Sequence, residues 1–319
     1  MIIHWLINMK SVTWPRIASK NLRSDLDLTN LEAVQLLELT ELVKTKPEDY
    51  RHALASQYLA LLFEKPSLRT RFTFELAIKQ LGGDVVVQVG RISEREPVKD
   101  VARNVERWCD GIVARTLYQE TVDELARYSR VPVINALSDR YHPCQALADL
   151  YTLRERFGDL KGLKLAFVGD GFNVAHSLLI TCARLGVDIT VATPRGYEPK
   201  PEIVRAAESL AVDSKVVITD DPSSAVKQAH GVYTDVWFSM GEETNYEQRT
   251  RDFAPYRVTE ELFLQARTDA IFLHCLPVKR TEETTDAVME HERSAVFDQA
   301  ENRLHAQKAL LLMLMGSND

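Results

Sequence analysis

The stretch FEKPSLRTRFTFE (residues 63–75) places hydroxyl and guanidinium side chains between an apolar segment and an amphipathic one. Ser67 and Thr70 can donate hydroxyl hydrogen bonds, and Arg69 can donate charge-assisted ones. Leu68 can contribute a backbone N–H, because the first N–H groups of a helix lack partners within it and lie at the positive end of its dipole. Together these groups suit a bound phosphate.

A structural interpretation fits the same residues about equally well. Pro66 would begin the helix, Ser67 would cap it, and the arginines would pair with Glu64 and Glu75 on a solvated face. The segment alone does not decide between the two interpretations.

Polar residues also follow two further apolar segments. Arg115 ends GIVAR (111–115), and NALSDRYHPCQ (135–145) offers His142 and Gln145. A lone histidine there is more often a satisfied structural residue than a catalyst, and Gln145 could merely cap a helix. Neighbouring parallel strands end at one edge of a sheet, however, so these side chains would converge with residues 67–70. That convergence favours an anion site with a neutral polarising group beside it.

The segment FVGDGFNVAHSLL (167–179) has the glycine turn that a dinucleotide site would use. The pattern is weak, because Val174 takes the third glycine position and no acid follows the apolar run at 188–193. Two later segments, TDVWFSMGEE (234–243) and FLHCLPVKR (272–280), supply Asp235, Ser239 and Cys275. Asp235 could instead cap a helix, and an isolated cysteine is usually a small buried hydrophobe.

The elements that must position these residues alternate between strand and helix, which is typical of parallel α/β domains. Helices are predicted at 69–81 and 97–108. A further stretch, 146–162, has leucines along one face and closes at Gly158, which predicts a helix bridging two domains. The predicted strands form two sets, 58–63, 84–89, 111–115 and 131–135, then 164–169, 188–193, 215–219, 231–236 and 270–275.

Composition limits the functions that these residues can serve. The 319 residues are long enough for two globular domains, and a net charge of −7 argues against a general nucleic-acid or anionic-membrane surface. The four cysteines form no Cys-x-x-Cys pair, so neither a disulfide framework nor a zinc site is predicted. MIIHWLINMK lacks the features of a signal peptide, and no apolar run has the length of a membrane span. A cytoplasmic protein is expected.

Seven ordered motifs together resemble the ornithine carbamoyltransferases, from about residue 30 to residue 316. They are FEKPSLRTRFTFE, GIVAR, HPCQALADL, GDGFNVAHSL, DVWFSMG, HCLP and FDQAENRLHAQKA. The Arg-Thr-Arg and His-Pro-x-Gln motifs alone would indicate the wider carbamoyltransferase family, which includes the aspartate enzymes. The Ser-Met-Gly and His-Cys-Leu-Pro motifs select the ornithine branch.

The resemblance implies two Rossmann-like domains with central parallel sheets flanked by helices, and an active site in the cleft between them. It assigns carbamoyl phosphate to residues 1–148, completed by a C-terminal helix at 300–319, and ornithine to residues 149–299. It also implies a homotrimer that needs no metal or organic cofactor.

The resemblance further implies the site residues. Arg115, His142 and Cys275 would be catalytic, with Cys275 placing and desolvating the amine. Ornithine would be bound by Asn173, Asp235, Ser239 and Met240, while Arg71 would be structural. Carbamoyl phosphate would be bound by Ser67, Leu68, Arg69, Thr70, Gln88, Arg115, His142, Gln145, Cys275, Leu276 and Arg303. The Leu276–Pro277 bond would be cis.

Four positions depart from the family pattern. Leu68 replaces a threonine, which a backbone donor tolerates, and Phe172 stands where an asparagine is common. The segment before Gln88 is about three residues short, so the glutamine that reaches a neighbouring subunit is less securely assigned. Lys279 replaces a frequent histidine. Two alternative functions therefore remain, a carbamoyltransferase for an acylated ornithine, putrescine or another amine, and a non-catalytic binding protein.

Overall fold

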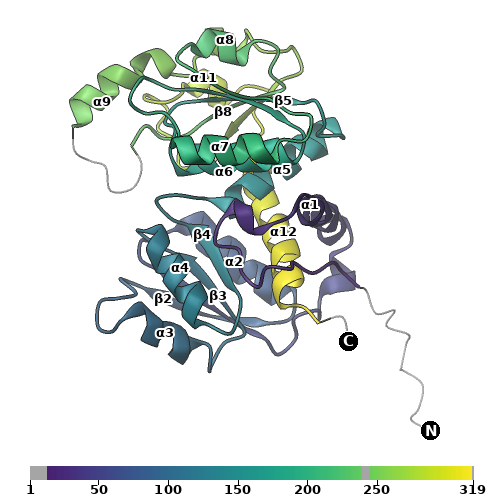
Figure 1. Cartoon of the computed structure of the whole chain (residues 1–319). Coiled ribbons are helices and arrows are strands. Elements are labelled where there is room, and N and C mark those ends of the chain that lie inside the picture. The colour runs from purple at the N-terminus through teal and green to yellow at the C-terminus, as the bar shows by residue number, and fades with distance from the viewer. Residues whose placement is uncertain (1–12, 239–244, 318–319) are drawn as a thin grey trace.

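The computed structural model describes residues 13–238 and 245–317 of the chain, which form two α/β bodies, one above the other in Figure 1. The lower body contains a four-stranded sheet in the order β2-β1-β3-β4, and the upper body a five-stranded sheet in the order β7-β6-β5-β8-β9. All pairings between neighbouring strands are parallel. The predicted fold class is therefore confirmed.

Each predicted strand is present in the structure. Most bounds agree within one or two residues, because apolar runs flanked by turns define them locally. β4 lies two residues later than predicted. The strands are β1 Tyr58–Phe63, β2 Asp84–Val89, β3 Gly111–Arg115 and β4 Val133–Leu137, then β5 Lys164–Val168, β6 Asp188–Ala192, β7 Val216–Thr219, β8 Gly231–Thr234 and β9 Ile271–His274.

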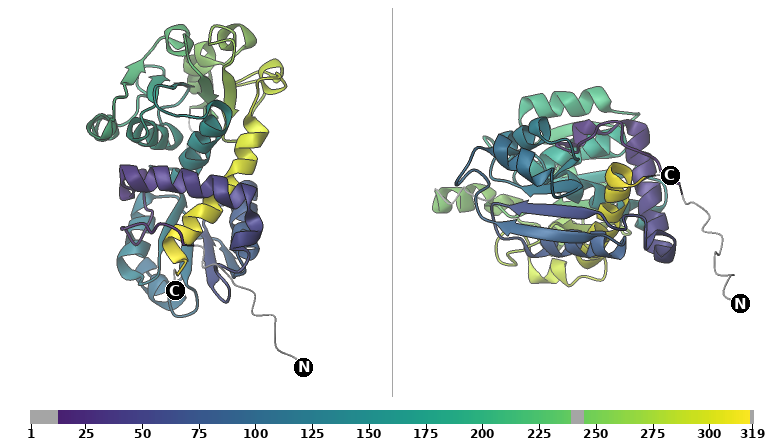
Figure 2. Two further views of the ribbon diagram at one scale, coloured as in Figure 1. Left: turned by 90° about the vertical axis from the view of Figure 1, so that its right-hand side faces the viewer. Right: turned by 90° about the horizontal axis from the view of Figure 1, so that it is seen from below.

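The helices of the lower body include one from the far end of the chain. α12 (Val296–Met315) packs against α1, α2 and α5, and Figure 2 shows it descending from the upper body into the lower one beside α1. Its last three turns are almost entirely buried. The other helices of this body are α1 Asn30–Thr45, α2 Leu68–Gln80, α3 Val98–Val105 and α4 Gln119–Tyr128.

The two bodies are joined by α5 (Pro143–Phe157), whose residues 143–153 are all buried. It begins before the predicted residue 146, because Pro143 occupies a first-turn position where its missing N–H costs nothing. Gly158 ends it with φ 83°, a conformation that favours glycine. One buried apolar cluster continues from Phe74 through Leu147 to Phe167, so both bodies share a core.

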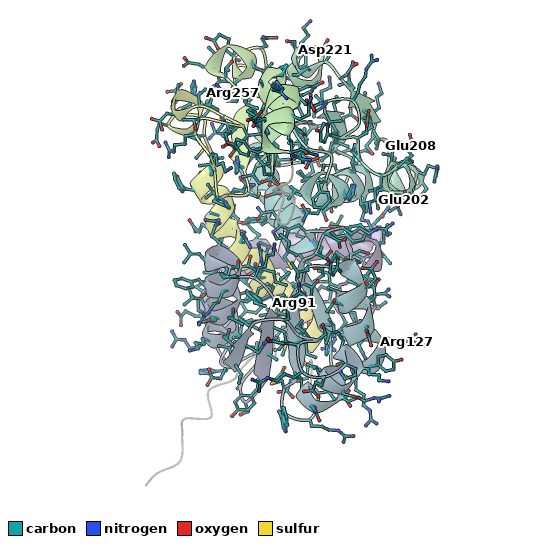
Figure 3. The ribbon with its side chains drawn as sticks, turned by 90° about the vertical axis from the view of Figure 1, so that its left-hand side faces the viewer. Arg91, Arg127, Glu202, Glu208, Asp221 and Arg257 are labelled. Atoms are coloured by element: carbon teal, nitrogen blue, oxygen red, sulfur yellow. The ribbon has the colours of Figure 1, made fainter. Side chains whose placement is uncertain are left out.

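The upper body surrounds its sheet with α6 (Asn173–Arg184), all of whose residues are buried, and with shorter helices. These are α7 Pro201–Leu210, α8 Pro222–Val226, α9 Tyr246–Phe253, α10 Glu260–Phe263 and α11 Asp286–Met289. Glu202 and Glu208 on α7 point outward at the side of this body in Figure 3. Among the described residues, none of the helices has the length and apolar character of a membrane span.

Candidate active site

A cavity of about 370 Å³ lies between the two bodies, where strands of both sheets end. Residues more than 200 positions apart in the sequence share its wall. Most of the residues predicted from the sequence line it, namely Ser67, Leu68, Arg69, Thr70, Arg115, His142, Asn173, Asp235, Cys275, Leu276 and Arg303.

The N-terminus of α2 faces this cavity, and its hydrogen bonds distinguish the two interpretations of residues 66–71. The Ser67 side chain makes no capping hydrogen bond. Glu64 accepts the backbone N–H groups of residues 92 and 117 instead of pairing with an arginine. Only Arg71 follows the structural interpretation, with its Nε 2.5 Å from Glu75 Oε1. Residues 67–70 are therefore available to a ligand.

Three guanidinium groups from different elements meet beside that helix end. Arg303 of α12 donates to Thr70 Oγ1 at 2.6 Å, and Arg115 Nη1 at the end of β3 lies 3.5 Å from the same oxygen. Burial lowers the pKa of Arg115 to about 10, with the positive charges of Arg303 and Arg69 adding to the effect. Burial also lowers the pKa of Arg69 and Arg303. Such a cluster is stabilised by an anion.

His142 precedes α5 and lies buried against this cationic wall. Burial lowers its pKa well below the usual value, and Arg303 and Arg115 lower it further. The imidazole is therefore neutral at pH 7. Its buried Nδ1 has no hydrogen-bond partner within the part of the chain that the structure describes. A neutral imidazole in this position can polarise a carbonyl group by donating a hydrogen bond.

The glycine turn before α6 serves the packing of the protein backbone. A Cβ atom at Gly171 would lie 2.4 Å from the backbone nitrogen of Pro199, so only glycine fits. The backbone of residues 197–199 therefore packs directly against this turn. Asn173 begins α6, lines the cavity, and donates from Nδ2 to the carbonyl oxygen of Ser138 at 2.7 Å.

Across the cavity from the arginines, Cys275 Sγ lies 3.0 Å from Asp235 Oδ1. Burial raises the pKa of Cys275 well above its usual value, and Asp235 raises it further, so the thiol keeps its proton. Burial likewise raises the pKa of Asp235, although hydrogen bonds from Cys275 and from the Val236 N–H oppose the effect. An ammonium group would relieve this carboxylate. Next to it, the Leu276–Pro277 bond is cis, as the resemblance implies.

Asp235, His274 and Cys275 offer ligand atoms within 4.8 Å of one another, which is close enough for a metal ion. The histidine is engaged on both sides, however. Its Nδ1 accepts the Leu276 N–H at 2.8 Å, and its Nε2 lies 3.1 Å from Glu283 Oε1. A metal would have to displace one of these contacts. In the structure, His274 instead holds the backbone next to Cys275 by accepting the Leu276 N–H.

Gln145 lies behind the cavity wall, fully buried, and does not line the cavity. Its Nε2 donates to Asp149 Oδ1 at 2.8 Å, and Gln299 Nε2 donates to the same oxygen at 2.6 Å. Gln299 Oε1 in turn accepts the His274 N–H. This buried chain links the helix that carries Gln145 to β9, the strand that ends just before Cys275.

Gln88 is a second predicted residue, after Gln145, that does not line the cavity. Gln88 lies on the edge strand β2, lines a separate groove of about 500 Å³, and donates to the Gly90 carbonyl at 3.3 Å. Ser239 and Met240 lie outside the described residues.

Among the cavity residues that were assigned no role from the sequence, two have side chains that could contact a ligand through charge or an aromatic ring. Phe238 and Lys279 both line the cavity, and the Lys279 ammonium lies 5.0 Å from the Phe238 ring centroid. The same ammonium is 3.1 Å from the Glu282 carboxylate. Lys279 was visible only as a departure from the family pattern, and Phe238 only as an aromatic residue near a strand end.

Two parts of the chain match the two domains of one protein family. Residues 20–155 match the carbamoyl-P binding domain of the aspartate/ornithine carbamoyltransferases. Residues 161–314 match the Asp/Orn binding domain of the same family. The boundary between the matches falls at the end of α5.

Individual relatives are similar over nearly the whole chain. The ornithine carbamoyltransferase of Thermus thermophilus is 52% identical over 289 residues, covering 89% of this chain and 93% of that protein. That of Thermococcus kodakarensis is 47% identical over 297 residues, covering 91% and 94%. The solved structure of the ornithine carbamoyltransferase from Pyrococcus furiosus aligns with a TM-score of 0.90 at 44% identity, covering 94% of this chain and 98% of that one.

Proposed function

The chain belongs to the aspartate/ornithine carbamoyltransferase family, and from this premise we propose that it transfers the carbamoyl group of carbamoyl phosphate to the δ-amine of L-ornithine, giving L-citrulline and phosphate. One observation carries the proposal. A single cavity combines three guanidinium groups at a helix N-terminus with a half-buried carboxylate and a buried thiol on the opposite wall. The first set suits a phosphate, and the second suits a substrate that carries an ammonium group.

Carbamoyl phosphate binds with its phosphate at the N-terminus of α2. The Leu68 N–H serves there as a backbone donor, so its side chain, which points to solvent, has no part in binding. The other phosphate ligands are Ser67, Arg69, Thr70 and Arg303. Arg115 and His142 bind the carbamoyl group. The resemblance adds Gln145 to this set; its side-chain oxygen has no partner among the described residues, but the residue lies behind the cavity wall.

The reaction passes through a tetrahedral species in which the carbonyl oxygen becomes negative. Arg115 and neutral His142 are donors placed for that charge, in a site from which burial has removed much of the water. Removing one such preorganised donor costs on the order of 10²- to 10³-fold in rate. Holding both substrates side by side supplies the other large contribution.

Ornithine binds on the upper wall. Asp235 accepts the α-ammonium group, which relieves the raised pKa of its carboxyl. Asn173 meets the α-carboxylate after exchanging its bond to Ser138. Ser239 and Met240, which the family resemblance adds to this set, complete it from outside the described residues.

The attacking δ-amine must be neutral, whereas ornithine in water carries a δ-ammonium group. A buried site favours the neutral form. Cys275 keeps its proton and donates to Asp235, so it places the amine and does not attack the carbonyl as a thiolate. The backbone carbonyls of Cys275 and Leu276 accept hydrogen bonds from the carbamoyl NH₂. The reaction calls for neither a metal nor an organic cofactor.

The domains and compartment follow the same proposal. Carbamoyl phosphate is bound by residues 1–148 with the C-terminal segment 300–319, which is supported by the packing of α12 on α1 and α2. Residues 149–299 bind ornithine. The four cysteines are free and buried, which suits the reducing cytoplasm.

We further propose a homotrimer in which Gln88 reaches a neighbouring site. Its position on an edge strand, away from its own cavity, supports this role. A stripe on α2 exposes Leu68, Phe72 and Leu76 by 63%, 55% and 47%, which gives the neighbour an apolar contact. Mixing two inactive variants, Gln88→Ala and Arg69→Ala, should restore activity, because a mixed trimer contains intact sites. Failure to restore it after subunit exchange would place Gln88 in its own site.

The acceptor assignment is tested by citrulline formation from carbamoyl phosphate and L-ornithine, with N-acetylornithine, N-succinylornithine and putrescine in parallel. L-Ornithine should be strongly preferred, because an acceptor without the ammonium or carboxylate leaves buried polar groups unpaired, at about 1–3 kcal/mol each. Preference for another amine would overturn the acceptor assignment. Turnover with no amine would overturn the enzymatic function.

A further inference from the structure

The first turns of α6 hold the backbone of the loop that carries His142. Three side chains at positions i, i+3 and i+4 of this helix point to one face and meet residues 138–142. Asn173 Nδ2 donates to the Ser138 carbonyl at 2.7 Å, and His176 Nδ1 lies 2.9 Å from the Arg140 carbonyl oxygen. The His142 N–H donates to Ser177 Oγ at 2.9 Å. The upper body is therefore hydrogen-bonded to the lower body at alternate residues of one loop, 138, 140 and 142.

Two of these side chains, His176 and Ser177, are oriented by a second hydrogen bond on the side away from the loop. His176 Nε2 accepts the Lys200 N–H at 3.2 Å, so Nδ1 carries the proton and donates to Arg140. Ser177 donates its hydroxyl hydrogen to Asp25 Oδ2 at 2.5 Å, which leaves its oxygen to accept the His142 N–H. Asp25, Ser177 and His142 are all buried. Water therefore cannot easily replace a lost partner.

The bond from the His142 N–H to Ser177 Oγ acts on the backbone that leads into α5. His142 lies before the first turn of α5, with φ −135° and ψ 62°, and its N–H has no place in the hydrogen-bond ladder of the helix. The imidazole lines the cavity beside Arg115 and Arg303. A shift of the backbone at this residue would displace the imidazole from the carbonyl that it polarises, and displacement of about 1 Å can cost on the order of 10²-fold in rate.

We propose that Ser177, oriented by Asp25, is a positioning residue that fixes the His142 imidazole in the site. The proposal rests on the carbamoyl transfer proposed above. It gives the Asn-Val-Ala-His-Ser run of α6 a role in the reaction beyond binding the amino acid through Asn173. It also makes one helix of the upper body responsible for the geometry of a catalytic group in the lower body. An ion pair between Arg140 and Glu202, 2.9 Å apart, also joins this loop to α7 of the upper body. Glu202 is labelled in Figure 3.

The first test is Ser177→Ala, measured by steady-state citrulline formation. The kcat should fall by about 10- to 100-fold, because the displaced imidazole loses transition-state contact. The KM for ornithine should change much less. Ser177→Thr keeps the hydroxyl and should recover most of the lost kcat.

Thr181→Ala is the matched control. Thr181 lies one turn further along α6 and donates to the other oxygen of the same carboxylate, Asp25 Oδ1, at 3.0 Å. No hydrogen bond joins it to the loop at 138–142 among the described residues. Its kcat should therefore stay close to that of the wild type. A loss equal to that of Ser177→Ala would show that the packing of Asp25 matters and that the bond to His142 does not.

The deciding experiment repeats Ser177→Ala in a His142→Ala background. If Ser177 acts through His142, the second substitution should lower kcat no further, since the effects of residues that act as a unit are not additive. An equal fold loss in both backgrounds would overturn the proposal. If Ser177→Ala does not fold, as judged by circular dichroism, Ser177→Cys supplies the same cycle with a weaker acceptor. A wild type that forms no citrulline would refute the proposed function, whereas an active wild type with additive losses would refute only this inference.

Discussion

The two walls of the cavity carry titratable groups of opposite kinds, guanidinium groups on the lower wall and a carboxyl and a thiol on the upper wall. On the lower wall, burial and mutual repulsion lower the pKa of Arg115, and burial lowers that of Arg69 and Arg303. On the upper wall, burial raises the pKa of Asp235 and of Cys275. An anionic ligand would stabilise the charged guanidinium groups of the lower wall. A cationic ligand would stabilise the ionised carboxylate of the upper wall.

Walls of opposite character allow one cavity to bind two substrates, each on its own wall. A phosphate relieves the arginines but would be repelled by Asp235, and an ammonium group relieves Asp235 but would be repelled by the arginines. The lower wall is also built from more distant parts of the chain, since Thr70 and Arg303 form their hydrogen bond across 233 positions. The folded chain therefore carries unfavourable electrostatics that binding offsets.

The largest effect is expected from breaking the lower wall. Arg69→Ala should lower kcat/KM for carbamoyl phosphate by about 10²- to 10³-fold, because the variant loses a preorganised charged donor. Arg71→Ala is the matched control, since its side chain is half-exposed and bonds Glu75. Steady-state kinetics with varied carbamoyl phosphate compares the two. Similar losses in both variants would mean that the general charge of α2 matters more than the cavity position.

Breaking the upper wall should affect the other substrate. Asp235→Asn should raise the KM for ornithine by about 10²-fold, because the α-ammonium loses an ionic partner in the cavity worth about 2–3 kcal/mol. The KM for carbamoyl phosphate should stay nearly constant. Varying each substrate in turn measures the split. A parallel rise in both KM values would contradict the separation of the two walls.

A smaller effect is expected at Cys275. Cys275→Ser keeps a hydroxyl that can donate to Asp235, so kcat should fall by no more than about tenfold if the residue only places the amine. A covalent nucleophile would lose nearly all activity on this change. Single-turnover kinetics of the variant measures which of these two losses occurs. A trapped carbamoyl thioester in the wild type would overturn the assignment.

The smallest effect concerns stability and Asp149, behind the lower wall. Burial raises its pKa from 3.8 to about 7. Between these values the folded chain binds a proton that the unfolded chain has lost, so stability falls as pH rises, by up to about 1.4 kcal/mol per pH unit.

Asp149→Asn removes this titration. The Tm of this variant should therefore fall less steeply than that of the wild type between pH 5 and pH 7. Exposed Asp159, just beyond the same helix, is the control, and Asp159→Asn should follow the wild-type slope. Equal slopes for Asp149→Asn and the wild type would show that Asp149 does not titrate in this range.

Much of the fold could be predicted because its signals are local. Runs such as Tyr58–Phe63 and Lys164–Val168 are apolar, bounded by turns, and became strands almost as predicted. Site residues could be predicted where a strand end and a motif coincided, as at Arg115 and His142. Gln145 shows the limit, because its position in the motif was clear but its burial behind the wall depends on Asp149 and Gln299.

Local sequence patterns specify the alternation of strands and helices, the two sets of strands and the chemistry of the residues at their ends. Those properties depend on apolar periodicity and turn residues within about ten positions. Which of these groups face each other depends on how the helices and sheets pack. The hydrogen bonds from Ser177 to Asp25 and from Arg303 to Thr70 join residues 152 and 233 positions apart. Such contacts form when helices pack onto the sheets and bury their polar groups together, and no local pattern specifies that packing.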